Sequence, residues 1–432
     1  MTISLRFMVA LTLVTCSAAA RADDDFERAP INYSKTAPND PIARLQSQID
    51  TGKLHLPFQK DLGYLPALLK AVHVLESSQV LVFSKTSLQR SRISPKTPRA
   101  LYFNDEIYIG FCQAGQVLEI SAVDPQLGAV FYTLDQQEAD RPKFVRQFDA
   151  CLLCHGSSQT KNVPGHLLRS VYPDRGGDAI LSLGTFRVDQ TTAIDRRWGG
   201  WYVTGMHGKQ THLGNLVVQN RNDRDPLANN PNGQNLTSIK DRFDSSAYLT
   251  PHSDIVALMV LEHQAEAQNL LSRANIQTRL ALHDHALLNK ELGREPDFRS
   301  ETTDRRIKSV GDPLVRYLLF SNEAPLSDKI VGTSTFTADF VKQGPRDSKG
   351  RSLREFNLER RLFKLPCSYL IYSESFDQLP LAMKEYVYQQ MHDVLTDRHY
   401  GGGFSHLDGS DRQAILEILR ETKKDLPSYW RK

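Results

Sequence analysis

The sequence has 432 residues, a formal net charge of +3 at pH 7, 40% hydrophobic residues and 24% charged residues. This composition is typical of a globular protein of two or three domains and excludes a fibrous, low-complexity or disordered chain. The near-neutral charge gives no electrostatic reason to expect nucleic acid or an anionic membrane surface as a partner.

The N-terminus has the pattern of a secretory signal peptide. Arg6 precedes an apolar run over Phe7–Val14, and small residues follow up to Ala20-Arg21-Ala22, which fits an A-x-A cleavage site. The run is far shorter than the roughly 20 residues of a membrane-spanning helix. We therefore expect residues 1–22 to be removed on export to the periplasm or the medium, with no transmembrane helix left. The alternative is a lipoprotein anchored at Cys16, in the stretch LVTC.

The first part of the mature chain reads as two segments. Residues 23–97 form a mixed N-terminal segment, with a helical pattern over 63–79 and a short strand over 79–85. Residues 98–240 form a β-rich domain, because runs of β-formers over 99–134 are interrupted by Asn-Asp, Gly and Asp-Pro, which predict hairpin turns.

The helical part follows. The charged stretch DRPKFVRQFDA, residues 140–150, reads as helix, and an Asn, Asp, Pro and Gly-rich loop covers 219–238. Residues 241–432 form a mainly helical domain that begins with a long helix capped by Ser253 or Asp254. The predicted fold class is therefore α+β: a β-rich segment leads into a helix around residue 151, and a mainly α-helical C-terminal region follows.

One motif carries chemistry. The stretch FDACLLCHGSSQ contains Cys151, Cys154 and His155 in a C-x-x-C-H pattern, which chance would produce in roughly 2 of 1000 chains of this composition. Two cysteines about one helical turn apart suit the two vinyl groups of a haem, and the adjacent histidine is placed to bind the iron. Covalent haem attachment in bacteria also requires export, which the signal peptide predicts.

Two other readings of the motif are weaker. A zinc site needs two more Cys or His ligands at a matching spacing, and the sequence has no second C-x-x-C. A thiol redox pair should follow a strand of a βαβ unit, whereas residues 140–150 read as helix.

With this motif, the sequence resembles the c-type cytochromes. The resemblance implies one haem c, attached through Cys151 and Cys154, with His155 as the proximal iron ligand. Further segments are similar to those of a set of large exported bacterial proteins described as cytochrome c-like, and this likeness covers nearly the whole mature chain. The β-rich environment departs from the small all-helical cytochromes, so the resemblance implies haem and export rather than their fold. The segments that carry the second likeness are 197–208, 253–264, 362–377 and 414–430.

The second axial position of the iron has several candidates. Met206 comes first, because a methionine on a downstream loop closes the haem in small c-type cytochromes, and the glycines beside it permit close approach. His207 and His212 lie in the same stretch and are chemically equivalent choices. Met259 and His263 follow, since they are one turn apart on one face of the long helix.

The sequence leaves other residues around the haem open as well. Arg169, Arg196 and Arg197 could pair with the haem propionates, since a guanidinium suits a carboxylate. His166 reads as a supporting residue rather than a ligand. Cys112 and Cys367 could form a disulfide or stay buried as free thiols.

Three functions are compatible with these residues. The first is electron transfer between exported redox partner proteins through a six-coordinate haem. The second is a haem enzyme of the peroxidase or nitrogen-oxide reductase type, with an open distal side and His207 or His212 as acid-base group. The third is a haem-based sensor or interaction module. With no second haem motif to supply electrons, electron transfer is the preferred reading.

Overall fold

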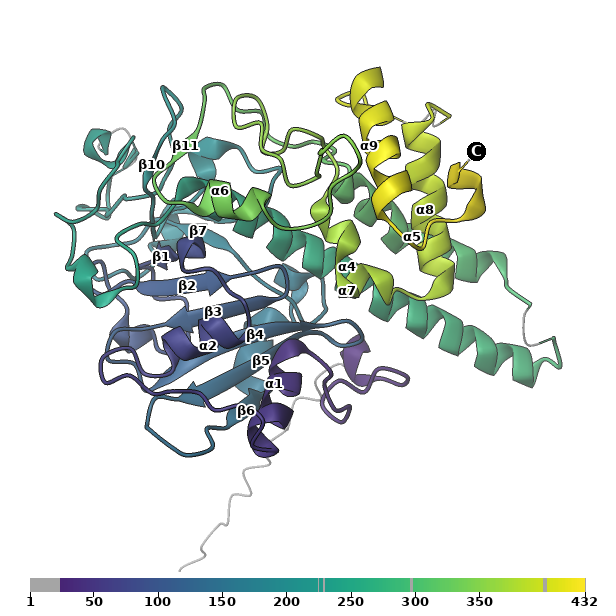
Figure 1. Cartoon of the computed structure of the whole chain (residues 1–432), viewed down its shortest axis with the longest axis horizontal. Coiled ribbons are helices and arrows are strands. Elements are labelled where there is room, and N and C mark those ends of the chain that lie inside the picture. The colour runs from purple at the N-terminus through teal and green to yellow at the C-terminus, as the bar shows by residue number, and fades with distance from the viewer. Residues whose placement is uncertain (1–23, 224, 228–229, 296–297, 399–401, 432) are drawn as a thin grey trace, which may run out of the picture.

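A computed structural model describes residues 24–223, 225–227, 230–295, 298–398 and 402–431 (Figure 1). Within these residues the largest β-sheet has seven strands and is antiparallel. The predicted signal peptide, with Cys16, lies outside these residues. Neighbouring strands run in the order β6-β5-β4-β3-β2-β1-β9, and every pair is antiparallel. The strands span β1 Val80–Val82, β2 Arg99–Phe103, β3 Ile107–Phe111, β4 Val117–Asp124, β5 Gly128–Asp135, β6 Phe144–Gln147 and β9 Trp201–Tyr202.

The two faces of the sheet are covered by different helices (Figure 1). Successive residues of a strand point to opposite faces, so Leu118, Ile120 and Leu134 share one face, where they pack with helices α1 and α2. On the other face, Phe103 and Tyr108 join the core around α4. The helices span α1 Pro41–Asp50, α2 Leu65–Ala71 and α4 Ile255–Glu291.

The C-terminal region is mainly helical and packs against α4 (Figure 1), and Phe336 also reaches the sheet, where its ring centroid lies 5.8 Å from that of Phe103. Two short ribbons complete the fold, β7 with β8 and β10 with β11. The remaining elements span α3 Asp149–His155, α5 Glu301–Leu318, α6 Phe336–Val341, α7 Glu374–Asp377, α8 Leu381–Leu395, α9 Gly409–Thr422, β7 Arg169–Val171, β8 Thr185–Arg187, β10 Gly205–Met206 and β11 Val331–Gly332.

The fold class is α+β, as the sequence predicts. The hairpins over 99–134 are confirmed as β2 to β5, and the β-rich run leads through β6 into α3, which bears the C-x-x-C-H motif. The region after residue 241 is mainly helical, again as predicted. Within the described ranges, no helix has the length and apolar surface needed to cross a bilayer.

Three details differ from the sequence predictions. The helix expected over 63–79 ends at Ala71, because the chain turns at His73, where φ is +54°. The helix expected over 140–150 is wrong, since Phe144–Gln147 pairs with β5 as an edge strand. The boundary expected after residue 97 falls between the paired strands β1 and β2, so residues 23–97 and 98–240 contribute to the same sheet.

The start of α4 is fixed by Asp254, one of the two predicted caps. One carboxylate oxygen accepts the backbone N–H of Val256 at 2.8 Å, and the other accepts the N–H groups of Thr333 and Ser334, each at 2.8 Å. Asp254 is fully buried. A single carboxylate therefore caps the central helix and also holds the segment around β11 against it.

Replacing Asp254 with Ala should lower the free energy of unfolding by about 4 kcal/mol, because it leaves several buried N–H donors without an acceptor. Urea denaturation measures this loss. Asp408→Ala is the matched control, since Asp408 caps α9 at an exposed position, and it should lower stability less. Equal losses in the two variants would contradict the role given to Asp254.

Candidate functional site

The C-x-x-C-H motif lies on α3, immediately after the edge strand β6. Asp149 is in the first turn of α3, where a negative charge is favoured by the helix dipole. Cys151 and Cys154 are three residues apart and thus on the same side of the helix. Cys151 is half-buried, Cys154 is exposed, and both are free thiols. Cys154 is therefore accessible and Cys151 partly accessible at the edge of the sheet.

His155, the predicted iron ligand, is held in one tautomer. Its Nδ1 lies 2.9 Å from the carbonyl oxygen of Gly165, and a carbonyl only accepts, so Nδ1 carries the proton. Burial lowers the pKa of His155 below its ordinary value, which keeps the ring neutral. Nε2 is thus left with a lone pair, as required of a histidine that binds a metal.

The loop after α3 is closed onto the helix end by further hydrogen bonds. The backbone N–H of Gly165 donates to the carbonyl of His155 at 2.8 Å, and the hydroxyl of Thr160 donates to the same carbonyl at 3.0 Å. Phe131 of β5 lies against the imidazole, with ring centroids 4.8 Å apart. The position of His155 is therefore fixed from the loop and from the sheet.

The sheet face that meets His155 is covered at one end and open at the other. Ser121 and Phe131 are buried on this face, whereas Glu119 and Thr133, two residues along the same strands, are half-exposed. Val145 of β6 is 54% exposed on the same open part. His155 lies at the border, so open sheet surface is present beside the candidate ligand.

A partly buried ion pair crosses this part of the sheet. Arg99 of β2 lies 3.0 Å from Glu119 of β4. Burial opposes ionisation of Glu119, but Arg99 and the hydroxyl of Ser87 hold its pKa below the ordinary value. The sequence analysis did not single out either residue, because a charge inside a strand has no local signature.

The chemistry of Cys151 does not fit a thiol redox pair. Burial raises the pKa of its thiol to about 11, whereas a redox-active cysteine needs a lowered pKa. The sheet that precedes α3 is antiparallel, so β6 and α3 are not part of a βαβ unit. For zinc, the described residues contain no group of three or more Cys, His, Asp or Glu side chains that could hold a metal ion.

Met206, the first distal candidate, lies far from His155. The N–H of Ile255 at the start of α4 donates to the carbonyl of Thr204, next to β10, while the loop after α3 binds Asn269 further along α4. These two attachment points are roughly 20 Å apart along the helix axis. Met206 is 43% exposed at the first of them, so the structure does not bring it to the imidazole of His155.

His207 and His212 lie together in the same loop cluster as Met206. Their ring centroids are 4.6 Å apart, and both side chains are buried. Both ring nitrogens of His207 are engaged, Nδ1 with the carbonyl of Gln210 and Nε2 with the N–H of Asn235. Nδ1 of His212 is buried without a hydrogen-bond partner.

The candidates on α4 are committed to the protein core. Met259 is buried in the core shared by α4 and the C-terminal helices. His263 is fully buried, with one ring nitrogen 2.6 Å from Oε1 of Gln190 and the other 2.8 Å from Oγ of Ser368. Neither ring nitrogen is therefore available to a metal.

His166 lies closer to the motif than any of these five residues. Its ring lies tilted against that of Tyr108, with centroids 4.1 Å apart, and the ring of Phe131, which touches His155, is 6.5 Å away. Nε2 is 2.8 Å from the hydroxyl of Ser121. This placement is compatible with the supporting role that the sequence predicts.

The predicted propionate partners differ in availability. Arg197 is buried and lies 2.9 Å from Glu262 of α4, so it is not free to bind another carboxylate. Arg196 lies over the ring of Phe186 at 5.6 Å, and Arg169 is half-exposed on β7. Cys112 and Cys367 are both buried and free, so the structure holds no disulfide between them.

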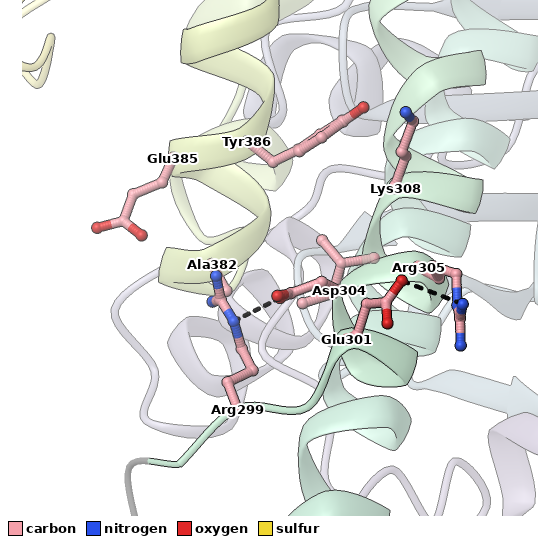
Figure 2. Close-up of a pocket in the computed structure, with 9 residues that line it drawn as sticks. Arg299, Glu301, Asp304, Arg305, Lys308, Ala382, Glu385 and Tyr386 are labelled. Carbon is pink, nitrogen blue, oxygen red and sulfur yellow. Dashed lines mark hydrogen bonds and ion pairs between the residues drawn. The ribbon is translucent and has the colours of Figure 1, made fainter.

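A separate groove of about 280 Å³ lies between α5 and α8. Figure 2 shows two ion pairs in the groove, Arg299 with Asp304 and Arg305 with Glu301, while Glu385 points away from them. The groove contains none of the residues that the sequence predicts for function.

No protein-family model, curated protein or solved structure matches the chain. The likeness to c-type cytochromes therefore stays a prediction from the motif.

Because His166 is buried, the protein should lose stability in acid. Burial lowers the pKa of His166 to about 3, while its unfolded value is about 6.5. Below pH 6.5, His166 therefore binds a proton in the unfolded chain but not in the folded chain, so the free energy of unfolding falls as the pH falls. His166→Asn should flatten this decline by about 1.4 kcal/mol per pH unit between pH 6 and pH 4. Urea unfolding at each pH measures the slopes, and equal slopes in wild type and variant would contradict the assignment.

Proposed function

We propose that this chain is an exported c-type cytochrome that carries one covalent haem on α3 and transfers electrons between redox partner proteins. The observation that carries the proposal is the state of His155: its Nδ1–H is bonded to the Gly165 carbonyl at 2.9 Å, one residue after a free, exposed thiol. With the proton on Nδ1, Nε2 carries the lone pair that a metal ligand needs.

The residues on α3 fit a haem by their donor set. Each thiol of Cys151 and Cys154 would add across one vinyl group of the porphyrin, its S–H hydrogen passing to the vinyl carbon. His155 would supply the proximal nitrogen to the iron. A bound haem c supplies a metal centre that changes oxidation state by one electron.

Electron transfer is supported by exposure at the motif. Leu153 is 63% exposed and Cys154 is exposed, so a haem attached there would lie close to the surface that a partner protein approaches. Export to the periplasm or the medium is supported by the signal peptide pattern of residues 1–22, and anchoring at Cys16 is the alternative. The partners are redox proteins, with no nucleic acid involved.

A second function is favoured by the positions of the distal candidates. Met206, His207 and His212 cluster near the start of α4, and His263 has both ring nitrogens engaged. If none of them reaches the iron, the distal side is open to small molecules. The chain would then act as a haem enzyme of the peroxidase or nitrogen-oxide reductase type, or as a haem-based sensor.

Replacement of either cysteine of the motif should change haem attachment. Protein matured with the bacterial attachment machinery should give a pyridine haemochrome with two thioether bonds, Cys154→Ala should give the spectrum of one, and the double variant should lose covalent haem. Cys112→Ala and Cys367→Ala are matched controls that should keep the wild-type spectrum. Wild-type protein without covalent haem would contradict the proposal.

Azide binding separates the two candidate functions. If a side chain of the protein closes the iron, the optical spectrum of the oxidised protein should resist azide, and Met206→Ala should create binding only if that side chain is Met206. If the distal side is open, wild-type protein should bind azide while its far-ultraviolet circular dichroism stays unchanged, and Met206→Ala should bind it equally well. Because the structure separates Met206 from His155, Met206→Ala should match the wild type; azide resistance of both proteins would support electron transfer, and azide binding by both would support the second function.

A further inference from the structure

One peptide group connects the candidate iron ligand to the central helix. The carbonyl of Gly165 accepts the Nδ1–H of His155 at 2.9 Å. The N–H of His166 belongs to the same peptide group and donates to Oδ1 of Asn269 on α4 at 2.7 Å. A donor on one side and an acceptor on the other therefore polarise this peptide in the same direction.

Asn269 is itself held in a single orientation. Its Nδ2 donates one hydrogen to the carbonyl of His166 at 2.8 Å and the other to Oε2 of Glu266 at 3.2 Å. Asn269 is 1% exposed. A rotated amide would place Nδ2 against the N–H of His166 and Oδ1 against the carboxylate, so only the observed orientation satisfies all of these groups.

Glu266 is the charged end of the chain of hydrogen bonds. It is 5% exposed, and its Oε1 lies 2.7 Å from Nζ of Lys161 and 3.7 Å from Arg187. A buried carboxylate persists as an anion when a cation faces it. The negative charge thus stands behind Asn269, on the side away from His155.

Gly165 is required for this arrangement. A Cβ atom at this position would lie 2.3 Å from Oδ1 of Asn269, which is closer than any side chain could sit. Because the residue has no Cβ, the asparagine reaches the peptide group directly.

We propose that Glu266 and Asn269 form a relay that increases the electron donation of His155 to the haem iron. Hydrogen bonds in a chain strengthen one another in a low-dielectric interior, and an acceptor on the second ring nitrogen makes a histidine ligand more basic. A more basic ligand favours ferric over ferrous iron and lowers the reduction potential. This inference rests on the proposed function, since it needs haem at His155.

The test is the reduction potential of Glu266→Gln in the full-length protein with its haem attached. The variant keeps the shape of the side chain and removes its charge, so the equilibrium should shift about tenfold toward the ferrous state, or about 59 mV for a one-electron couple. Glu262→Gln is the control, because Glu262 lies one turn away on α4, pairs with Arg197 and has no contact with the relay. It should shift the equilibrium by less than about threefold.

The titration is made at pH 9. Burial raises the pKa of Glu262 to about 8, although Arg197 opposes the rise, so at pH 9 both substitutions remove a charge. Lys161→Asn is the second relay variant and should shift the potential the opposite way, because Glu266 is then less neutralised. Asparagine suits the left-handed backbone at this position, where φ is +63°.

A second readout separates the relay from simple electrostatics. The Nδ1 proton of His155, observed by NMR in the ferrous carbon monoxide complex, should move upfield in Glu266→Gln and stay in place in Glu262→Gln. Equal shifts of potential in the two variants, or an unmoved Nδ1 proton in Glu266→Gln, would overturn the relay. If Glu266→Gln does not accumulate with haem, Lys161→Asn is the test. A reduction potential below that of the wild type supports the relay, and an equal or higher one contradicts it. Wild-type protein without covalent haem would overturn the proposed function and the relay together.

Discussion

The fold depends on the hydrogen bonds and ion pairs that α4 makes with its buried polar side chains. This helix runs through the centre of the molecule, so polar groups on it are removed from water and each needs a partner in the protein. Glu262 binds Arg197, Glu266 binds Lys161, and Asn269 binds both backbone groups of His166. The three residues follow one another at helical spacing and form a single stripe toward the segment that follows α3.

This constraint explains how a helix as short as α3 could hold the haem that we propose. By itself, α3 has only seven residues, and those that are partly buried, Cys151 and His155 among them, are not fully enclosed in the core. What fixes His155 is the loop from Thr160 to Gly165, and what fixes that loop is the stripe on α4. The site is therefore divided between an exposed part, where the thiols are reachable, and a rigid part, where the imidazole is oriented from the core. Such a division suits a group that is reached from outside and then held in a defined geometry.

The sequence predicts those features that depend on neighbouring residues. The hairpins from β2 to β5 follow from alternating β-formers between turn residues, and the cap at Asp254 from its position before an apolar helix. The motif on α3 is read from five consecutive residues. The strand β6 was missed because its charged residues resemble an exposed helix, and pairing with β5 decides its conformation only in the fold.

The remaining parts of the site depend on contacts between distant segments. No local pattern links the loop after His155 to Asn269, which is more than a hundred residues away, or places Arg99 of β2 beside Glu119 of β4 across the intervening strand β3. Met206 is predicted by analogy with small c-type cytochromes, in which the loop that carries the methionine returns directly to the haem. Here the segment around β10 is instead paired with β11 near the start of α4, which separates Met206 from His155.

The central claim is that α3 carries a covalent haem. Trypsin should release the peptide Gln147–Lys161, since Arg146 and Lys161 flank the motif. Mass spectrometry of this peptide, from protein made with the haem-attachment machinery, should show the mass of the dithiol peptide plus one intact haem. An unmodified peptide, or one lighter by two hydrogens through a bond between Cys151 and Cys154, would contradict the account.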